Sequence, residues 1–219
     1  MNTAFVIMAK PPEFGKVKTR LAKNIGQRKT LTLYQACLAD VCGAAVQTSA
    51  AKFIFWSGDA YLRGCSKLLS QPLRSQFSHR TQVPGDLGQK IAGVFQTVFA
   101  EGFTRVIVVG SDFPGLDVLH WQAAEAALQT HDVVLGPTQD GGYYLIGLTK
   151  FHPTLFAAMP WSQATLFQAT LACCKKHTLS VATLAKGRDI DQIQDIMALA
   201  TERLLSDQVR RVLKQFAYI

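Results

Sequence analysis

Short, unbroken apolar runs alternate along the chain with longer segments in which apolar residues recur every third or fourth position. The run Val106–Val109 holds four consecutive β-branched residues, which is typical of a strand covered on both faces in a sheet packed between helices. Strands are predicted from such runs, and from one more polar stretch, over Thr3–Ala9, Lys52–Trp56, Phe77–Val83, Val106–Val109, Asp132–Leu135, Tyr143–Leu148 and Leu179–Leu184.

Segments with helical spacing fill the intervals between these runs, and one of them begins after Asp86, a natural N-cap. The alternating order predicts an α/β fold with a mostly parallel central sheet and helices on both faces. At this length, with 48% hydrophobic residues, we expect one domain over residues 1–219. The predicted helices are Arg28–Gln47, Tyr61–Ser70, Leu87–Phe99, Leu116–Gln129, Ser162–Lys176, Gln192–Leu205 and Asp207–Phe216.

One acid, Asp112, lies on the turn directly after the apolar run Val106–Val109. In open α/β sheets the ligand crevice lies beyond the carboxyl ends of the strands. A carboxylate there suits Mg²⁺, which usually takes one or two carboxylates and completes its shell with water and phosphate oxygens. Asp112 could equally cap the helix predicted from Leu116, and this stretch alone leaves both roles open.

The loop after the first predicted strand is basic. Pro11 and Pro12 exclude a helix there, and Gly15 permits a tight turn. The Walker pattern is absent, because the leading glycine is missing and Val17 follows the Gly-Lys pair. In an extended loop the alternating residues Lys16, Lys18 and Arg20 would line one side, a geometry suited to clamping a polyphosphate.

Most of the net charge of +8 is concentrated in residues 1–29, which hold seven bases and one acid, a net charge of +6. Such a segment indicates an anionic ligand, either phosphate groups or nucleic acid, although a solvated basic loop has the same composition. Nucleic acid is disfavoured because Phe14 is the one aromatic residue in the basic loop and the acidic turns would repel a phosphate backbone.

Three further turns lie at predicted strand or helix ends. Asp140, followed by Gly141 and Gly142, is a second acid on a ligand-facing turn, although such turns are often purely structural. Asp189 and Asp191 would face the same way in extended backbone, and a Mg²⁺ ion between Asp112 and one of them could bridge phosphates. The alternative is that Asp191 caps the helix predicted from Gln192. The helix start at 85–88 offers free amides to a nucleobase edge or an anion.

The sequence lacks the features of several classes of protein. The five cysteines form no CxxC pair and the five histidines have no partner at ligand spacing, so a zinc site or disulfide framework is not indicated. No apolar run has the length of a membrane span, and residues 2–9 are too short for a signal peptide. We therefore expect a cytoplasmic protein. Whether it forms a homodimer stays open.

Six segments together carry a family resemblance: KPPEFGKVKTRLA at 10–22, GDLG at 85–88, GSDFPGL at 110–116, GPTQDGGYYLIG at 136–147, WS at 161–162 and DID at 189–191. In this order they resemble the DUF2064 family of the nucleotide-diphospho-sugar transferase superfamily, beside the phospholactate guanylyltransferases and MobA-like enzymes. The resemblance implies a GT-A, Rossmann-like fold in which the first loop binds nucleotide phosphates. Asp112 would bind a divalent metal, Mg²⁺ or Mn²⁺, with Asp191 as the second ligand and Asp189 beside it. One departure is Gln89-Lys90, where the family usually has Glu-Arg.

The family is described as containing both glycosyltransferases and nucleotidyltransferases. Because a nucleotidyltransferase must hold a triphosphate and stabilise departing pyrophosphate, the basic segment favours transfer from an NTP to a phosphorylated small-molecule acceptor. A glycosyltransferase using a nucleotide-sugar is the alternative, and a nucleic-acid-binding module is a remote one. The catalytic candidates are Lys18, Arg20 and Asp112. The nucleotide-binding candidates are Lys10, Gly15, Lys16, Lys18, Arg20, Asp86, Gly88, Ser111, Asp140, Gly141 and Gly142.

Overall fold

A computed structural model describes residues 2–58, 71–201 and 205–216 of the chain. One seven-stranded sheet has the order β3-β2-β1-β4-β6-β5-β7. Its strands are β1 Thr3–Ala9, β2 Ala51–Trp56, β3 Ser78–Thr81, β4 Arg105–Gly110, β5 Val133–Pro137, β6 Tyr143–Leu148 and β7 Val181–Thr183. The helices are α1 Thr19–Ile25, α2 Gln27–Val46, α3 Gln71–Arg74, α4 Leu87–Ala100, α5 Val118–Ala127, η3 Pro153–Leu155, α6 Leu166–Lys176, α7 Ile193–Thr201 and α8 Asp207–Gln215.

Strand direction brings four loops to one edge of the sheet. Strands β1, β2, β3 and β4 are parallel, and β6 runs antiparallel between β4 and β5, so β5 and β7 again point the same way as β1. The predicted α/β fold with a mostly parallel sheet is confirmed. The segments after β1, β4, β5 and β7 therefore meet at the edge where a ligand crevice is expected.

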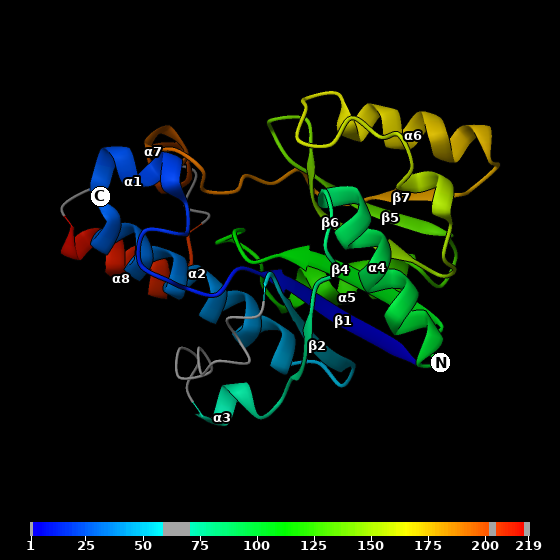
Figure 1. The fold of residues 1–219 in the computed structure, drawn as a ribbon, viewed down its shortest axis with the longest axis horizontal. Helices are drawn as coiled ribbons and strands as arrows, with labels where there is room; N and C mark the ends of the chain where they lie inside the picture. The colour runs from blue at the N-terminus through cyan, green and yellow to red at the C-terminus, as the bar shows by residue number, and fades with distance from the viewer. Residues whose placement is uncertain (1, 59–70, 202–204, 217–219) are drawn as a thin grey trace.

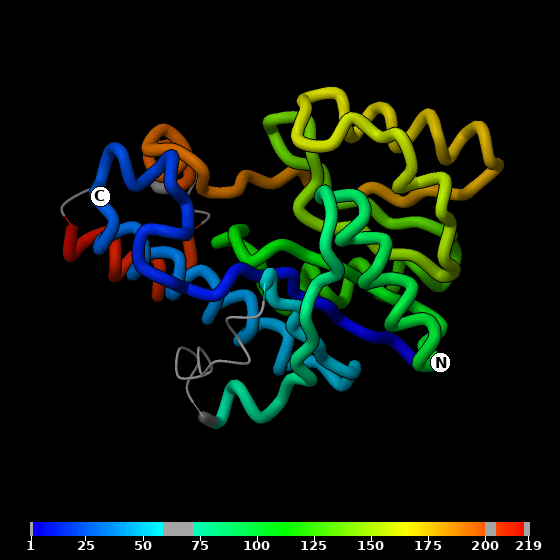
Figure 2. The backbone as a smooth tube through the Cα atoms, in the orientation of Figure 1, coloured from blue at the N-terminus to red at the C-terminus, as the bar shows by residue number. Residues whose placement is uncertain are grey.

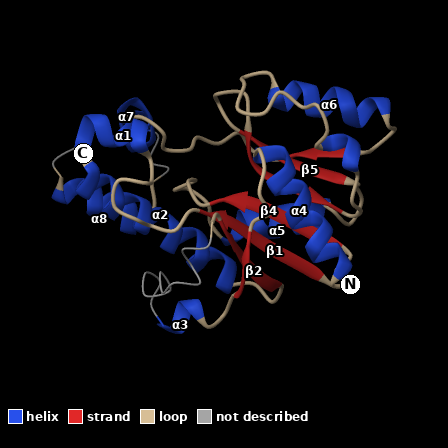
Figure 3. Cartoon of the chain, viewed as in Figure 1, coloured by secondary structure: helices blue, strands red, loops and turns tan. Residues whose placement is uncertain are grey.

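Helices cover both faces of the sheet (Figures 1 and 3). On one face α2 and α5 pack over the strands, and the Trp121 ring of α5 stacks on Phe5 of β1 at 4.4 Å between centroids. On the other face α4 and α6 enclose a second core that includes Phe95 and Cys174. The two cores explain why the strand interiors read as continuous apolar runs.

A third apolar cluster lies beside the sheet and is built from helices alone. Leu21, Leu33, Ile196 and Leu213, from α1, α2, α7 and α8, are all buried in it. Figures 1 and 2 show this group away from the strands, with the last helix running next to the first two. The extended segment 184–192 connects it to β7 and passes the edge where the loops meet.

Three predicted elements are corrected by the structure. A helix forms at Thr19–Ile25, where we predicted extended loop, because Leu21 and Ile25 pack into the helical cluster. Helix α6 begins at Leu166, four residues after the predicted start, because Ser162 adopts a left-handed φ of 61°. Helix α5 begins at Val118 and not at Leu116.

The helix predicted at 61–70 lies outside the described residues. No helix in the described ranges combines the length and apolar content needed to cross a bilayer.

Candidate active site

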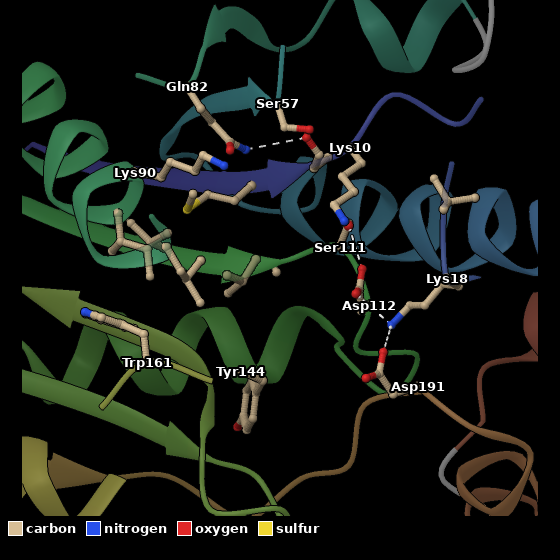
Figure 4. A pocket seen from close by; sticks show the side chains of 18 of the residues that line it. Lys10, Lys18, Ser57, Gln82, Lys90, Ser111, Asp112, Tyr144, Trp161 and Asp191 are labelled. Carbon is tan, nitrogen blue, oxygen red and sulfur yellow. Dashed lines mark hydrogen bonds and ion pairs between the residues drawn. The ribbon is translucent and has the colours of Figure 1, made fainter. Parts of the chain in front are cut away.

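A cavity of about 520 Å³ opens at the sheet edge where β1 and β4 end (Figure 4). It is lined by charged residues from the loop after β1, by the end of β4, by the start of α4 and by residues from β6 to α6. Its size is within the range of small-molecule sites. Five basic residues line it against three acids: Lys10, Lys16, Lys18, Arg20 and Lys90 against Asp86, Asp112 and Asp191.

Lys18 lies at the centre of the charged part. Its Nζ is 2.7 Å from Asp112 Oδ2 and 3.2 Å from Asp191 Oδ1, and only 8% of its side chain is exposed. Its neighbours Val17 and Leu21 are buried, which fixes the backbone on both sides. The residue has φ 46° and ψ 48°, a left-handed conformation that costs a non-glycine residue roughly 1–2 kcal/mol. Such strain is often found at functional positions, and here it aims the ammonium at the two acids.

The two nearest carboxylates and the ammonium of Lys18 stabilise each other's charged forms. Burial alone would lower the pKa of Lys18, but Asp112, Asp191 and Asp189 raise it above its ordinary value. Burial would raise the pKa of Asp112, but Lys18 and a hydrogen bond from Ser111 hold it below its usual range. At neutral pH the cluster therefore contains an ammonium and an ionised Asp112.

A chain of buried hydroxyl groups holds the Asp112 side chain in place. The alternative role of Asp112, as the cap of the following helix, is wrong. Helix α5 is capped by Asp117, whose side chain accepts from His120 N. The Ser111 hydroxyl donates to Asp112 Oδ1 at 2.7 Å and lies 3.0 Å from the Tyr34 hydroxyl. The Tyr34 hydroxyl accepts from the Lys10 amide at 3.0 Å and also lies 2.8 Å from the Lys10 carbonyl oxygen, so its one proton can go to that oxygen or to Ser111 Oγ. One tyrosine of α2 thus braces both loops that form the site.

Asp191 also does not cap the helix that follows it. The backbone amides of Asp191 and Gln192 donate to the Asp195 side chain, at 3.0 and 2.8 Å. The Asp191 carboxylate is left to Lys18 and, at 3.5 Å, to Arg20. Its position is set by buried Ile190, whose amide donates to the Asp112 carbonyl oxygen at 3.3 Å.

Asp112 and Asp191 have the chemistry of a divalent-cation site. Two carboxylates converge on one point, where the Lys18 ammonium now stands as the cation. Mg²⁺ commonly takes one or two carboxylates and completes its shell with water and phosphate oxygens. Among the described residues no group of three or more His, Cys, Asp or Glu could hold a metal. A metal bound here would therefore complete its coordination shell with water and with phosphate oxygens of a bound substrate.

The basic loop does not form the single extended row that we predicted. Lys16 is 75% exposed and pairs with Glu13 at 2.5 Å, whereas Lys18 is buried and Arg20 lies on α1. Alternation fails because the chain turns left-handed at Lys18 and then becomes helical. Lys10 and Lys90 line the cavity, and neither forms an ion pair with any described residue.

Several predicted ligand residues have structural environments instead. Asp140 accepts from the Thr138 hydroxyl and from Gly142 N, which closes its own turn. A Cβ on Gly141 would lie 1.9 Å from the Ala164 carbonyl oxygen, so this glycine permits close packing of the 162–165 loop. A Cβ on Gly88 would similarly meet Trp161. The predicted residues that do not line the cavity are Gly15, Gly88, Asp140, Gly141, Gly142 and Asp189.

Other cavity residues were not predicted. Tyr34 lies within the predicted helix Arg28–Gln47, and its hydroxyl role has no local sequence signal. The Gln82 amide donates to the Phe55 carbonyl oxygen at 2.8 Å and, with Ser57, borders the cavity above the end of β1 (Figure 4). Trp161 and Tyr144 line it as well. Trp161 belongs to a resemblance motif, which was the one available signal for it.

The comparisons with known proteins agree with this fold. The DUF2064 family model, described as an uncharacterized protein conserved in bacteria, matches residues 43–163. No curated protein matches the sequence. Among solved structures, a protein from Desulfovibrio desulfuricans G20 assigned to the nucleotide-diphospho-sugar transferases is 31% identical, with TM-score 0.88 over 99% of this chain and 97% of that chain.

Two more distant structures share the fold alone. A cytidylyltransferase from Leptospira borgpetersenii serovar Hardjo-bovis is 14% identical, with TM-score 0.55 over 98% of this chain and 94% of that one. Rv0371C from Mycobacterium tuberculosis H37Rv, in complex with manganese, is 13% identical, with TM-score 0.53 over 94% and 100%. The chain belongs to the DUF2064 family, within the transferases of the nucleotide-diphospho-sugar transferase superfamily.

Proposed function

We propose that this protein is a nucleotidyltransferase that joins an NTP to a phosphorylated small-molecule acceptor and releases pyrophosphate. The observation that carries the proposal is the cluster of Lys18, Asp112 and Asp191 in a cavity whose lining has more basic than acidic residues. Lys10 and Lys90 add positive charge that no described carboxylate neutralises by an ion pair. A triphosphate meeting a phosphorylated acceptor concentrates negative charge, which such a lining would stabilise.

In the proposed reaction an oxygen of the acceptor phosphate attacks the α-phosphorus of the NTP. A new P–O bond forms, the bond from the α-phosphorus to the oxygen bridging to the β-phosphorus breaks, and pyrophosphate leaves with the electron pair. The Lys18 ammonium, which pairs with both acids in this structure, would turn to the α-phosphate when a metal takes its place and would stabilise the charge there. Arg20, which is 75% exposed and near the mouth, would contact the departing pyrophosphate.

A divalent metal, Mg²⁺ or Mn²⁺, would be held by Asp112 and Asp191. When bound, such an ion neutralises phosphate charge and aligns the reacting groups. The manganese complex of Rv0371C, a protein with the same fold, supports the use of a divalent metal. Asp189 would add negative charge near these ligands at neutral pH, since burial, against the effect of Lys18, raises its pKa only to about 6.

The solved structures support nucleotide use in two ways. The Leptospira protein is named a cytidylyltransferase, which favours transfer from an NTP. The Desulfovibrio protein is assigned to the nucleotide-diphospho-sugar transferases, which keeps transfer of a sugar from a nucleotide-sugar as the second candidate. The two candidates differ in the bond that breaks, and therefore in whether pyrophosphate is released.

Pyrophosphate release measured over the four NTPs, each with a panel of phosphorylated acceptors and with Mg²⁺ or Mn²⁺, tests the proposal. We expect release with at least one pair, and its loss in Asp112→Asn. Asp117→Asn is the matched control, because it removes a carboxylate from the same loop that only caps α5. If the protein binds nucleotide-sugars alone, and only with metal, the glycosyltransferase candidate replaces this one.

A further inference from the structure

The cavity has two unlike halves. Its charged half surrounds Lys18, and its other half, here called the apolar pocket, is lined by Met8, Ile91, Val108, Ile146, Trp161 and Leu166. In Figure 4 the labelled Trp161 lies at the opposite end from Lys18 and Asp191. Leu87, the first residue of α4, also lines the cavity and is 42% exposed, so apolar surface extends toward solvent.

The floor of the apolar pocket is a flat patch on three adjacent strands. Val108 of β4 is in register with Ile146 of β6, and Met8 of β1 with Gly110. Val108 and Gly110 are two residues apart and so face the same side of the sheet. A Cβ on Gly110 would meet nothing within 4 Å, so the missing side chain leaves open space above the floor.

The polar atoms of the aromatic walls are turned away from this space. Trp161 Nε1 donates to the Phe156 carbonyl oxygen at 3.3 Å, and the neighbouring Tyr143 ring, which packs edge-on against Trp161, has its hydroxyl buried away from solvent. The rings therefore present carbon to the pocket. Apart from a hydroxyl that reaches Lys90, which also lines the cavity, each sugar hydroxyl buried there would lose its hydrogen bonds to water without a replacement, which is unfavourable.

A nucleobase fits the polar wall better than the apolar pocket. Recognition of a base edge needs donors and acceptors, and the Ser57 hydroxyl, the Gln82 side-chain oxygen and the backbone at Gly85 offer them on the β1–β3 side of the cavity. With the phosphates at Lys18 and the base at this wall, the apolar pocket is left for the second substrate.

We infer that the apolar pocket binds the hydrocarbon body of the acceptor, which is a phosphate monoester of an apolar alcohol and not a sugar phosphate. The inference rests on the proposed function, because it places the acceptor's phosphate near Lys18 and Asp112. An unbranched or branched hydrocarbon chain would lie on Met8, Val108 and Ile146 and leave past Leu87.

Equilibrium binding of a homologous series tests the inference without turnover. Methyl, butyl and hexyl phosphate are titrated against the protein in the presence of the α,β-methylene analogues of CTP and of GTP, which cannot release pyrophosphate, with glucose 1-phosphate as the polar comparison. Each methylene that enters the pocket should tighten binding about three- to fourfold. Affinity that does not change with chain length, or tighter binding of glucose 1-phosphate, overturns the inference.

Two variants locate the effect. Gly110→Val fills the open space and should abolish the chain-length dependence while methyl phosphate still binds. Gly43→Ala, at another glycine with open space around it, is the matched control. Met8→Gln, nearly equal in volume, should weaken hexyl phosphate more than methyl phosphate and gives a second measurement if Gly110→Val does not fold. An unchanged series in either folded variant places the hydrocarbon elsewhere.

Failure of pyrophosphate release with an intact chain-length series would count against the nucleotidyl reaction alone.

Discussion

The turns after β4 and after β5 occupy similar positions in the fold, but their acidic residues make different interactions. Each follows a buried strand, each lies at the same sheet edge, and each carries one acid, Asp112 or Asp140. Asp112 pairs with Lys18 from a segment far away in the sequence, whereas Asp140 is satisfied within its own turn by Thr138 and Gly142. Position at a strand end therefore does not make a site. A long-range partner of opposite charge decides which acid is available for chemistry.

The sharpest test of this comparison exchanges each acid for its amide. Asp112→Asn should keep the fold but lose metal-dependent nucleotide binding, and any pyrophosphate release should fall about a thousandfold, because a charged ligand becomes neutral. Thermal shift with nucleotide, with and without Mg²⁺, measures the binding. Asp140→Asn is the control and should keep the shift. Equal responses in the two variants would remove the distinction between the turns.

The partner of Asp112 can be removed in the same way. Lys18→Met should lower the rate about a hundredfold or more, because the α-phosphate then loses the ammonium that stabilises its charge. Lys16→Met is the matched control, since Lys16 is exposed and, among the described residues, forms its one ion pair with Glu13. Initial rates of pyrophosphate release give the comparison, and a Lys16→Met loss as large as that of Lys18→Met would argue for an unstructured basic clamp.

Asp189 interacts electrostatically with Lys18, the partner of Asp112, and with Asp140 of the other turn. Burial first, and then Asp140 and Asp191, raise its pKa from 3.8 to about 6, against the effect of Lys18. The pKa of Asp189 is higher in the folded than in the unfolded protein. Protonated Asp189 therefore stabilises the fold fully below about pH 4, and this stabilisation is lost as the pH rises through about 6. Relative to wild type, Asp189→Asn should gain about 1–3 kcal/mol in the free energy of unfolding between pH 4 and 7. Urea denaturation across that range checks it, and parallel pH curves contradict it.

The smallest expected effect is on the brace behind Asp112. Tyr34→Phe keeps the buried ring but removes the hydroxyl that joins Lys10 and Ser111, so kcat/KM should fall about tenfold with the fold retained. Combined with Ser111→Ala, the loss should be less than the product of the single losses, because both variants break one chain. Independent losses would show that Tyr34 acts apart from Asp112.

Much of the architecture was predictable because it depends on local apolar pattern. The bounds of β1 and β6 match the predicted ranges, and β4 contains the predicted Val106–Val109 run. The cap at Asp86 is confirmed, with Gln89 completing a capping box. Errors fell where tertiary packing overrides local preference, as in α1, whose apolar residues pack against α7 and α8.

The sequence by itself determined three things: the alternation of strands and helices along the chain, the sheet edge at which polar turns collect, and the family. Buried runs and strand-end acids are local features, and the motifs carry their spacing with them. Only the tertiary structure decided that Lys18 turns inward, that Tyr34 braces two loops, and that Asp140 serves its own turn. The physical reason is that these roles depend on ion pairs and hydrogen bonds between segments far apart in the chain, which no local pattern encodes. The apolar pocket has the same origin, since its floor comes from three strands and its walls from two helices and a loop.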